Sequence, residues 1–288
     1  MSLHALVLVL FAAVCHAVWN LSAKRVFGDG PLFVFLYSVG SLAIWGPITA
    51  VWFALHHPAM GWAWVVGAAV SGALHVGYGI VLQHGYRVGD LTLVYPTARG
   101  VGPLVTLVVA IALLGERPPV WSVVGACVVL LGIAVITVPR SLSLHGTRQR
   151  EGLRWGAGTG LTIAAYTLWD SHAVNALRLP PLPYFTLSLA FQVLALAPRA
   201  WVRRPELPSL AQRNWRPALT IALLSPLAYV LVLEAMRLAP VALVAAARET
   251  SIVIGALLGY LLLREPNPAR RFVGAVVVLL GIGLLVLG

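Results

Sequence analysis

The stretch VVLLGI occurs twice in this chain, at residues 128–133 and at 277–282, 149 residues apart. Further pairs at the same spacing are Gly125 with Gly274, Glu116 with Glu265, and Arg99 with Arg248. At a spacing of 150, Trp19-Asn20 corresponds to Trp169-Asp170, and Arg87 to Arg237. Such self-similarity indicates two copies of one structural unit.

The composition excludes an ordinary soluble domain. The mean hydropathy is +0.90, 60% of the residues are hydrophobic and only 10% are charged, against about 25% charged in soluble domains. We therefore expect an all-α integral membrane protein, because a helix satisfies its own backbone hydrogen bonds in lipid. The net charge of +11 does not indicate a nucleic-acid partner, since the basic residues flank apolar runs instead of forming one surface.

About 20 apolar residues cross a bilayer as a helix, and this criterion predicts ten spans. They are residues 4–23, 31–54, 62–84, 91–114, 119–138, 155–177, 183–199, 216–235, 240–263 and 270–287. With five spans each, the two copies would lie in opposite orientations, as in many transporters. We predict a first repeat over 1–138, a linker over 139–154 and a second repeat over 155–288.

The distribution of Lys and Arg predicts the orientation. Odd-numbered connections hold fifteen of these residues and even-numbered connections hold three. The positive-inside rule then places the 139–154 linker in the cytoplasm and both termini outside. The N-terminal run lacks the basic start of a signal peptide, so we expect it to remain as a span.

Charged residues inside spans are site candidates, because each costs about 2.5–3.5 kcal/mol at the bilayer centre. Arg99 lies between Pro96 and Pro103, which predicts a kinked or broken fourth span, whereas Arg248 lies in a ninth span without prolines. Either arginine could hold a carboxylate or phosphoryl group. The alternative is a buried network in which Arg99 and Arg248 neutralise their carboxylate neighbours, Glu249 and Asp170.

The first and sixth spans present matching polar faces, which could form the walls of a central cavity. The members are His16, Trp19, Asn20 and Ala23, repeated as Tyr166, Trp169, Asp170 and Ala173. An interfacial aromatic belt is the alternative for the two tryptophans. Candidates for a coupling proton or a substrate amine are Asp170, Glu249 and His16.

Three further residues, His75, Tyr78 and Tyr95, are candidates for substrate contact. The alternative for His75 is a hydrogen-bonded packing residue. The pairs Gly156–Gly160 and Gly255–Gly259 have the spacing that lets membrane helices approach closely. Because the sequence has no Walker A, HExxH or GxSxG motif, we expect no catalytic residues, no metal and no cofactor.

The chain resembles the drug/metabolite transporter superfamily with two tandem EamA domains. The resemblance rests on the repeated five spans, on HAVWNLSAK at 16–24, on YPTARGVGPLVTLVVAIALLGERP at 95–118 and on LLLREPNP at 261–268. The pairing of HAVWN with YPTARG is similar to a subgroup linked to phosphonate utilisation. The resemblance implies a secondary carrier of small metabolites, often an exporter, although several relatives are thought to keep both termini inside.

We therefore predict an inner-membrane carrier that moves a zwitterionic or anionic solute, such as an amino acid, organic acid or phosphonate, by alternating access. The expected partners are this solute and the lipid bilayer, and the expected state is a monomer or homodimer. A flippase for a lipid-linked headgroup is the alternative. An intramembrane enzyme is disfavoured because His16 and Ser22 point to different helix faces.

Overall fold

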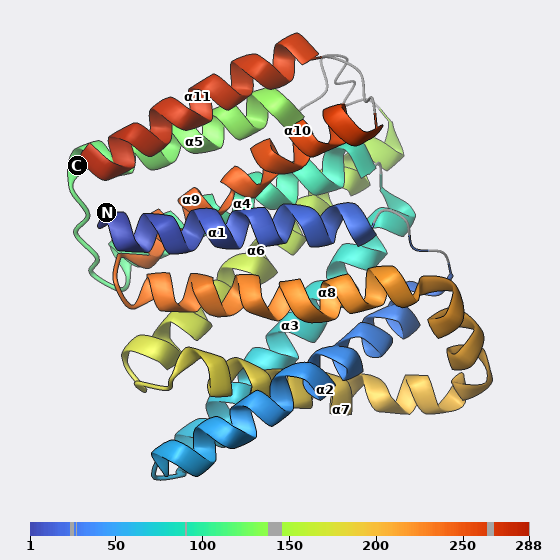
Figure 1. The fold of residues 1–288 in the computed structure, drawn as a ribbon. Coiled ribbons are helices and arrows are strands. Elements are labelled where there is room, and N and C mark those ends of the chain that lie inside the picture. Colours follow the sequence, from blue (N-terminus) through green and yellow to red (C-terminus); the bar gives the residue numbers. More distant parts are fainter. Residues whose placement is uncertain (24–25, 27, 90, 138–145, 264–267, 288) are drawn as a thin grey trace.

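The computed structural model describes the chain except for residues 24–25, 27, 90, 138–145, 264–267 and 288. Within that part, the regular elements are helices (Figure 1). They are α1 (Leu3–Ala23), α2 (Gly30–His56), α3 (Trp62–Val88), α4 (Leu91–Ala112), α5 (Val120–Thr137), α6 (Thr147–Asn175), α7 (Pro181–Val202), η1 (Arg204–Glu206), α8 (Leu207–Met236), α9 (Val241–Arg248), α10 (Thr250–Leu263) and α11 (Pro268–Leu287). Each predicted span corresponds to one helix, except that α9 and α10 together form the ninth.

These helices make the chain a multi-pass membrane protein. Among the described residues, seven helical segments are long and apolar enough to cross a bilayer, and α5 and α11 are shorter apolar helices. The more polar α6 buries Thr159, Thr167 and Asp170 inside the protein. A helix covered by its neighbours can carry polar groups because its side chains bond to protein instead of facing lipid.

The helices are arranged as two inverted repeats. Both termini lie at the same end of the molecule, and α5 ends and α6 begins at the opposite end (Figure 1). Helices α1, α2 and α3 correspond to α6, α7 and α8. The contact of α1 with α8 therefore matches that of α6 with α3, and the contact of α2 with α8 matches that of α7 with α3. Each such contact recurs with the halves exchanged, as a two-fold relation between inverted repeats requires.

The repeated VVLLGI stretches lie where α5 crosses α11. A Cβ atom at Gly125 would lie 2.7 Å from the carbonyl oxygen of Gly281, and one at Gly132 would lie 2.9 Å from that of Gly274. Four glycines therefore let the two backbones touch in two reciprocal pairs. Small residues at a helix crossing are a common way to pack membrane helices, which gain little from burying apolar side chains away from lipid.

The sequence predicted a kinked or broken fourth span, and the predicted break is wrong. Helix α4 runs without interruption through Pro96 and Pro103, whereas the ninth span is interrupted at Glu249. There the N–H of Glu249 bonds to the carbonyl of Ala246 at 3.1 Å, and the N–H of Ile252 bonds to that of Glu249 at 2.9 Å. A proline removes one backbone donor, and packing along α6 holds the rest of α4 in place.

One of the two predicted small-residue pairs makes a close helix contact. Gly156 and Gly160 face α4, where added Cβ atoms would lie 2.7 Å from Thr97 and 2.6 Å from Val101. At Gly255 an added Cβ would meet no atom within 4 Å, so no close approach forms at that residue, and the surroundings of Gly259 lie outside the described part.

Two boundaries differ from the sequence prediction. Helix α6 begins at Thr147, so the end of the predicted linker is helical, while residues 138–145 lie outside the described part. Helix α8 begins at Leu207 inside the predicted connection 200–215 and bends at Asn214, where φ is −120°. Pro217 follows the bend one turn later.

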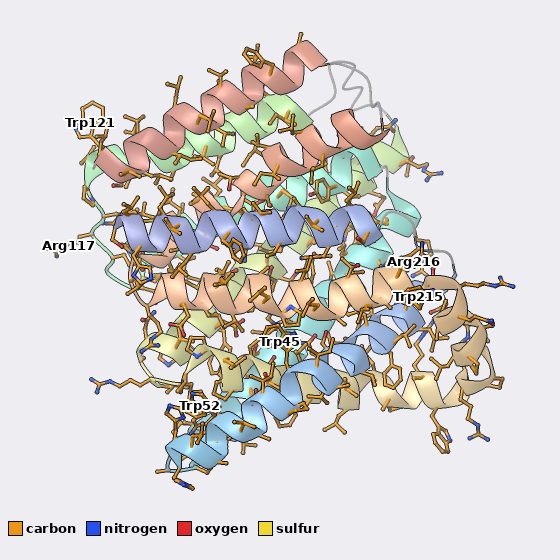
Figure 2. The ribbon with its side chains drawn as sticks, viewed as in Figure 1. Trp45, Trp52, Arg117, Trp121, Trp215 and Arg216 are labelled. Atoms are coloured by element: carbon orange, nitrogen blue, oxygen red, sulfur yellow. The ribbon has the colours of Figure 1, made fainter. Side chains whose placement is uncertain are left out.

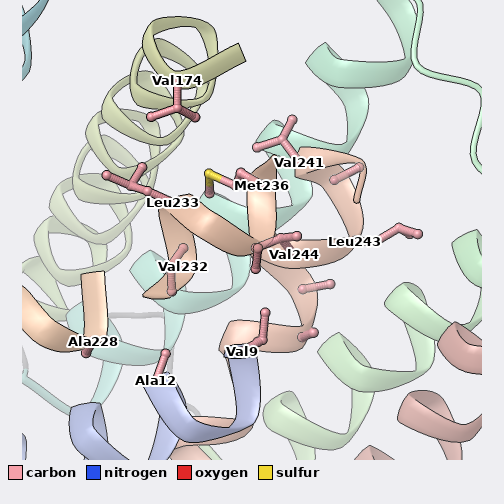
Figure 3. Close-up of a cluster of buried hydrophobic side chains, with 14 of the residues drawn as sticks. Val9, Ala12, Val174, Ala228, Val232, Leu233, Met236, Val241, Leu243 and Val244 are labelled. Carbon is pink, nitrogen blue, oxygen red and sulfur yellow. The ribbon is translucent and has the colours of Figure 1, made fainter. Parts of the chain in front are cut away.

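The apolar core lies around the turn from α8 to α9. Leu233 and Met236 of α8 lie beside Val244 of α9, with Val9 of α1 and Val174 of α6 facing them (Figure 3). Every residue of α9 is buried. This packing fixes the C-terminal end of α9, which carries Arg248.

Aromatic and basic side chains gather at both ends of the helices. Trp121 and Arg117 lie toward the end that holds the termini, and Trp215 and Arg216 lie toward the opposite end (Figure 2). Trp121 and Trp215 are 64% and 56% exposed. They fit the two interfacial zones of a membrane, where such amphipathic side chains are enriched.

One ion cluster joins the start of α2 to the end of α7. The Asp29 carboxylate accepts the N–H of Leu32 at 2.9 Å and a guanidinium hydrogen bond from Arg199 at 3.3 Å, and it also pairs with Arg203. Partial burial raises the pKa of Asp29, but the Leu32 N–H and the two guanidinium groups together lower that pKa below its usual range. At a spacing of 150 the counterpart of Asp29 is Leu179, so this cluster has no equivalent in the second repeat.

Candidate functional site

Arg99 lies in the middle of α4 with two buried partners from other helices. Its Nη1 donates to Oε1 of Glu249 at 3.3 Å, and its Nη2 donates to Nε2 of His16 at 2.9 Å. The Tyr95 ring lies 5.7 Å from the guanidinium carbon. Because a guanidinium can only donate, Nε2 of His16 must accept, and the ring is therefore neutral with its proton on Nδ1. This geometry argues against His16 as the predicted carrier of a coupling proton.

Glu249 lies between the two arginines that the repeat relates. Its Oε1 is also 3.7 Å from Nε of Arg248. Within the described part, buried atoms without a hydrogen bond include Arg99 Nε, Arg248 Nε and Nη2, and Glu249 Oε2. Two guanidinium groups therefore face one carboxylate, which leaves one positive charge and several unsatisfied donors. Such buried groups are costly unless a ligand or water completes them.

Asp170 belongs to a second cluster. It is fully buried, its Oδ1 accepts the Tyr184 hydroxyl at 2.6 Å, and its Oδ2 accepts the Tyr229 hydroxyl. Nε2 of His75 lies 3.9 Å from Oδ2. The predicted network of two arginines and two carboxylates thus forms only in part, because Glu249 contacts both arginines whereas Asp170 is held by tyrosines.

Aromatic rings connect the two clusters. The His75 ring stacks on Tyr166 with centroids 4.3 Å apart, and it meets Tyr229 edge-on at 5.2 Å. Tyr166 and Tyr229 both lie close enough to Arg248 for a Coulomb interaction. His75, Tyr166 and Tyr229 thus form a continuous aromatic contact beside Asp170.

The remaining predicted site residues have local roles in this structure. Nε1 of Trp169 donates to the carbonyl of Gly67 at 3.0 Å, and the Asn20 amide donates to the carbonyl of His16 at 2.9 Å. Both side chains thus bond to backbone. Neither places a polar group against the arginines.

Two other candidates pack beside the clusters. Trp19 meets His16 edge-on with ring centroids 4.8 Å apart, and its buried Nε1 has no hydrogen-bond partner. Tyr78 packs edge-on against Tyr166 with ring centroids 5.6 Å apart. These contacts place Trp19 near the Arg99 cluster and Tyr78 near the ring stack.

The sequence analysis did not single out Tyr184, Tyr229 or Phe185, which surround Asp170 and His75. A usable signal was present, since a tyrosine in an apolar span needs a partner for its hydroxyl. The sequence positions of Tyr184 and Tyr229 could not show that the partner of their hydroxyls is Asp170.

The Asp170 cluster has no equivalent at the positions that the repeat relates to it. At a spacing of 150, the counterparts of His75, Asp170, Tyr184 and Tyr229 are Ser225, Asn20, Val34 and Gly79. By contrast, Arg99 and Arg248 are counterparts of one another. The arginine pair therefore follows the two-fold relation, and the carboxylate cluster breaks it.

Comparison with known proteins assigns the family. A model of the EamA-like transporter family matches residues 150–287, which contain α7 to α11 and nearly all of α6. Residues 150–287 thus form an EamA-like domain. This result agrees with the resemblance stated from the sequence and makes the chain a membrane transporter of small molecules.

The fold comparison covers nearly the whole chain. A solved structure, described as the crystal structure of a protein, has a TM-score of 0.77 over 98% of this chain and 96% of its own. Its sequence identity of 16% shows a shared fold alone. No curated protein matches the chain.

Proposed function

We propose that this protein is a secondary transporter for a small anionic or zwitterionic metabolite, bound between Arg99 and Arg248. The observation that carries the proposal is the uncompensated positive charge of two buried guanidinium groups around one carboxylate. An incoming carboxylate or phosphoryl group would accept from the unsatisfied donors. Charged residues of membrane spans commonly mark such substrate pathways.

The position of the arginines favours alternating access. Arg99 and Arg248 come from opposite repeats, and helix α4 packs on α9. A solute held by both arginines would lie at the interface of the repeats, where rocking of one half against the other exposes it to each side in turn. The moving halves would be 1–138 and 155–288.

The orientation is part of the proposal. The connections rich in Lys and Arg lie at the end opposite the termini, so the positive-inside rule places that end in the cytoplasm and both termini outside. We propose the inner membrane as the location and a monomer or homodimer as the state.

A solute screen tests the proposed substrate class. Purified protein is heated with glutamate, glycine, lactate, methylphosphonate, choline or putrescine, and solutes that raise the melting temperature go to counterflow in proteoliposomes. We expect shifts and exchange from solutes that carry an anionic group. Shifts from choline or putrescine alone, or exchange by none of the six, would overturn the proposal.

A further inference from the structure

His75 is held in a defined tautomer. Its Nδ1 lies 2.9 Å from the carbonyl oxygen of Ser71, one turn back on α3. A carbonyl can only accept, so Nδ1 carries a hydrogen. In the neutral ring Nε2 is therefore a bare lone pair, and it faces Oδ2 of Asp170 at 3.9 Å.

A bare nitrogen lone pair facing a carboxylate oxygen is repulsive, and one proton between them removes the repulsion. The proton either makes His75 an imidazolium opposite the Asp170 carboxylate, or it makes Asp170 a neutral acid. The hydroxyls of Tyr184 and Tyr229 already donate to Asp170 and stabilise its ionised form. The His75–Asp170 pair can thus exist in two states that differ by one proton.

The groups around the pair favour this assignment. The titratable side chains that contact the pair are Tyr166 of α6, Tyr184 of α7 and Tyr229 of α8. Tyr78, Arg248, Arg99, Glu249 and His16 lie beyond them. Tyrosine and arginine keep their protons throughout the physiological range. Since Tyr184 and Tyr229, which contact Asp170, keep their protons, a proton taken up within this contact lies on His75 or Asp170.

We propose that His75 and Asp170 form the proton-binding dyad of this transporter, and that a proton on the dyad and an anion at Arg99–Arg248 favour each other's binding. The proposal rests on the proposed function for its second half. The arginine cluster carries one positive charge and the Asp170 cluster one negative charge, so the two clusters together are neutral without the extra proton. With it, the two clusters carry one positive charge, which an anion neutralises.

The same linkage gives a direction. Binding free energies of two ligands are reciprocal, so anion affinity rises as pH falls through the titration of the dyad. Because the counterpart of Asp170 is Asn20 in the first repeat and that of His75 is Ser225 in the second, the described residues hold one such dyad, and the transporter couples one proton to each cycle.

A nuclear magnetic resonance titration of the purified full-length protein tests the dyad without any substrate. The imidazole nitrogens are labelled with nitrogen-15 and followed between about pH 5 and pH 9, where histidine changes charge. His75→Gln assigns the signal, and His84→Gln, on the same helix, is the matched control. We expect Nδ1 to stay protonated while Nε2 titrates, with the midpoint moved by about one pH unit or more in Asp170→Asn.

An Nε2–H tautomer of neutral His75, or a midpoint that Asp170→Asn leaves in place, would overturn the dyad. The wild-type tautomer alone decides the first point, so the result does not depend on how well the variants fold.

Proteoliposomes test the coupling separately. For the anionic probes of the screen, we compare uptake driven by a proton gradient with exchange in the absence of a gradient. In His75→Gln the ratio of the two should fall about tenfold, which corresponds to about 1.4 kcal/mol of lost coupling, while His84→Gln keeps the wild-type ratio. An unchanged ratio in His75→Gln would overturn the coupling. Failure of every probe to exchange in the wild type would instead count against the proposed function and leave the titration result standing.

Discussion

Two regions of the molecule show how differently the two copies of one duplication have changed. One is the crossing of α5 and α11, and the other is the centre formed by α3, α6, α7 and α8. At the crossing the two copies kept the same residues. The glycines there pair reciprocally, Gly125 with Gly281 and Gly132 with Gly274. At the centre the copies diverged, so that a buried carboxylate cluster exists on one side only. A glycine at a backbone–backbone contact cannot be replaced without overpacking, whereas a position surrounded by side chains can change its chemistry when those side chains change with it.

The arginines lie between these two extremes. Arg99 and Arg248 were retained as a pair, but Gly100 of the first copy became Glu249 in the second, or the reverse. One carboxylate thus serves two symmetric cations. The following predictions test whether the retained and the diverged positions differ in their effect on stability.

The largest effect is expected from Glu249→Gln. Removing the charge between two buried guanidinium groups should cost about 3–5 kcal/mol, as for other broken buried ion pairs, and lower the melting temperature by about 10 °C. Adding Gly100→Glu restores a carboxylate at the symmetric position, where no atom lies within 4 Å of an added Cβ. The double variant should recover about half of the loss in a thermal unfolding assay, and no recovery would show that the two positions are not equivalent.

Gly281→Ala should be next in size. Its added Cβ would lie 2.7 Å from the Val129 nitrogen and 2.8 Å from the Gly125 oxygen, both of them backbone atoms. Overpacking of this kind costs about 1–3 kcal/mol. Gly283→Ala on the same helix meets nothing within 4 Å and serves as the control. Equal melting temperatures for the two variants would contradict the close crossing.

Tyr184→Phe should cost less, about 1.5 kcal/mol, because it removes one hydrogen bond to a charged group. The ring stays in place, and Tyr229 and His75 still face Asp170. Tyr37→Phe, whose ring packs against Phe33 in α2, is the control. Chemical unfolding in detergent measures both, and a loss in Tyr37→Phe as large as that in Tyr184→Phe would argue against a special role for the Asp170 cluster.

The smallest effect concerns the ion cluster at Asp29. Asn also caps a helix well, so Asp29→Asn removes only the charge and should cost about 0.5–1 kcal/mol at neutral pH. Because the pKa of Asp29 is lowered in the folded protein, its stabilisation is present above the usual pKa and is lost as pH falls through the lowered value. Melting temperatures of the variant and the wild type should therefore converge in acid, and a constant difference down to about pH 3 would contradict this account.

Much of the fold could be read from the sequence, because hydropathy and duplication report on the whole helix. All ten spans and their inverted order follow from these two signals. The helix interruption at Glu249 could not be predicted from the sequence, since the prolines indicated a break in α4 instead. Local helix propensity also does not include the packing of α6 against α4, which keeps α4 continuous. The bend at Asn214 was missed for the same reason.

The candidate site was predictable one residue at a time but not as a network. Arg99 and Asp170 are charged residues in apolar spans, and the free-energy cost of burying a charge in the membrane identifies them as site candidates. That Glu249 lies between Arg99 and Arg248, and that tyrosines hold Asp170, depends on how α6 to α9 pack, which no spacing within one helix encodes.

The most direct test of the account is counterflow exchange by Arg99→Lys and Arg248→Lys in proteoliposomes. Lysine keeps the charge but loses the forked donors, so the account predicts at least about a tenfold loss of exchange in both variants, with melting temperatures close to that of the wild type. Arg87→Lys, at the exposed end of α3, should exchange normally. Exchange within about twofold of the wild type in both folded arginine variants, less than the roughly 1.4 kcal/mol of a tenfold change, would contradict the claim that the arginine pair binds the solute.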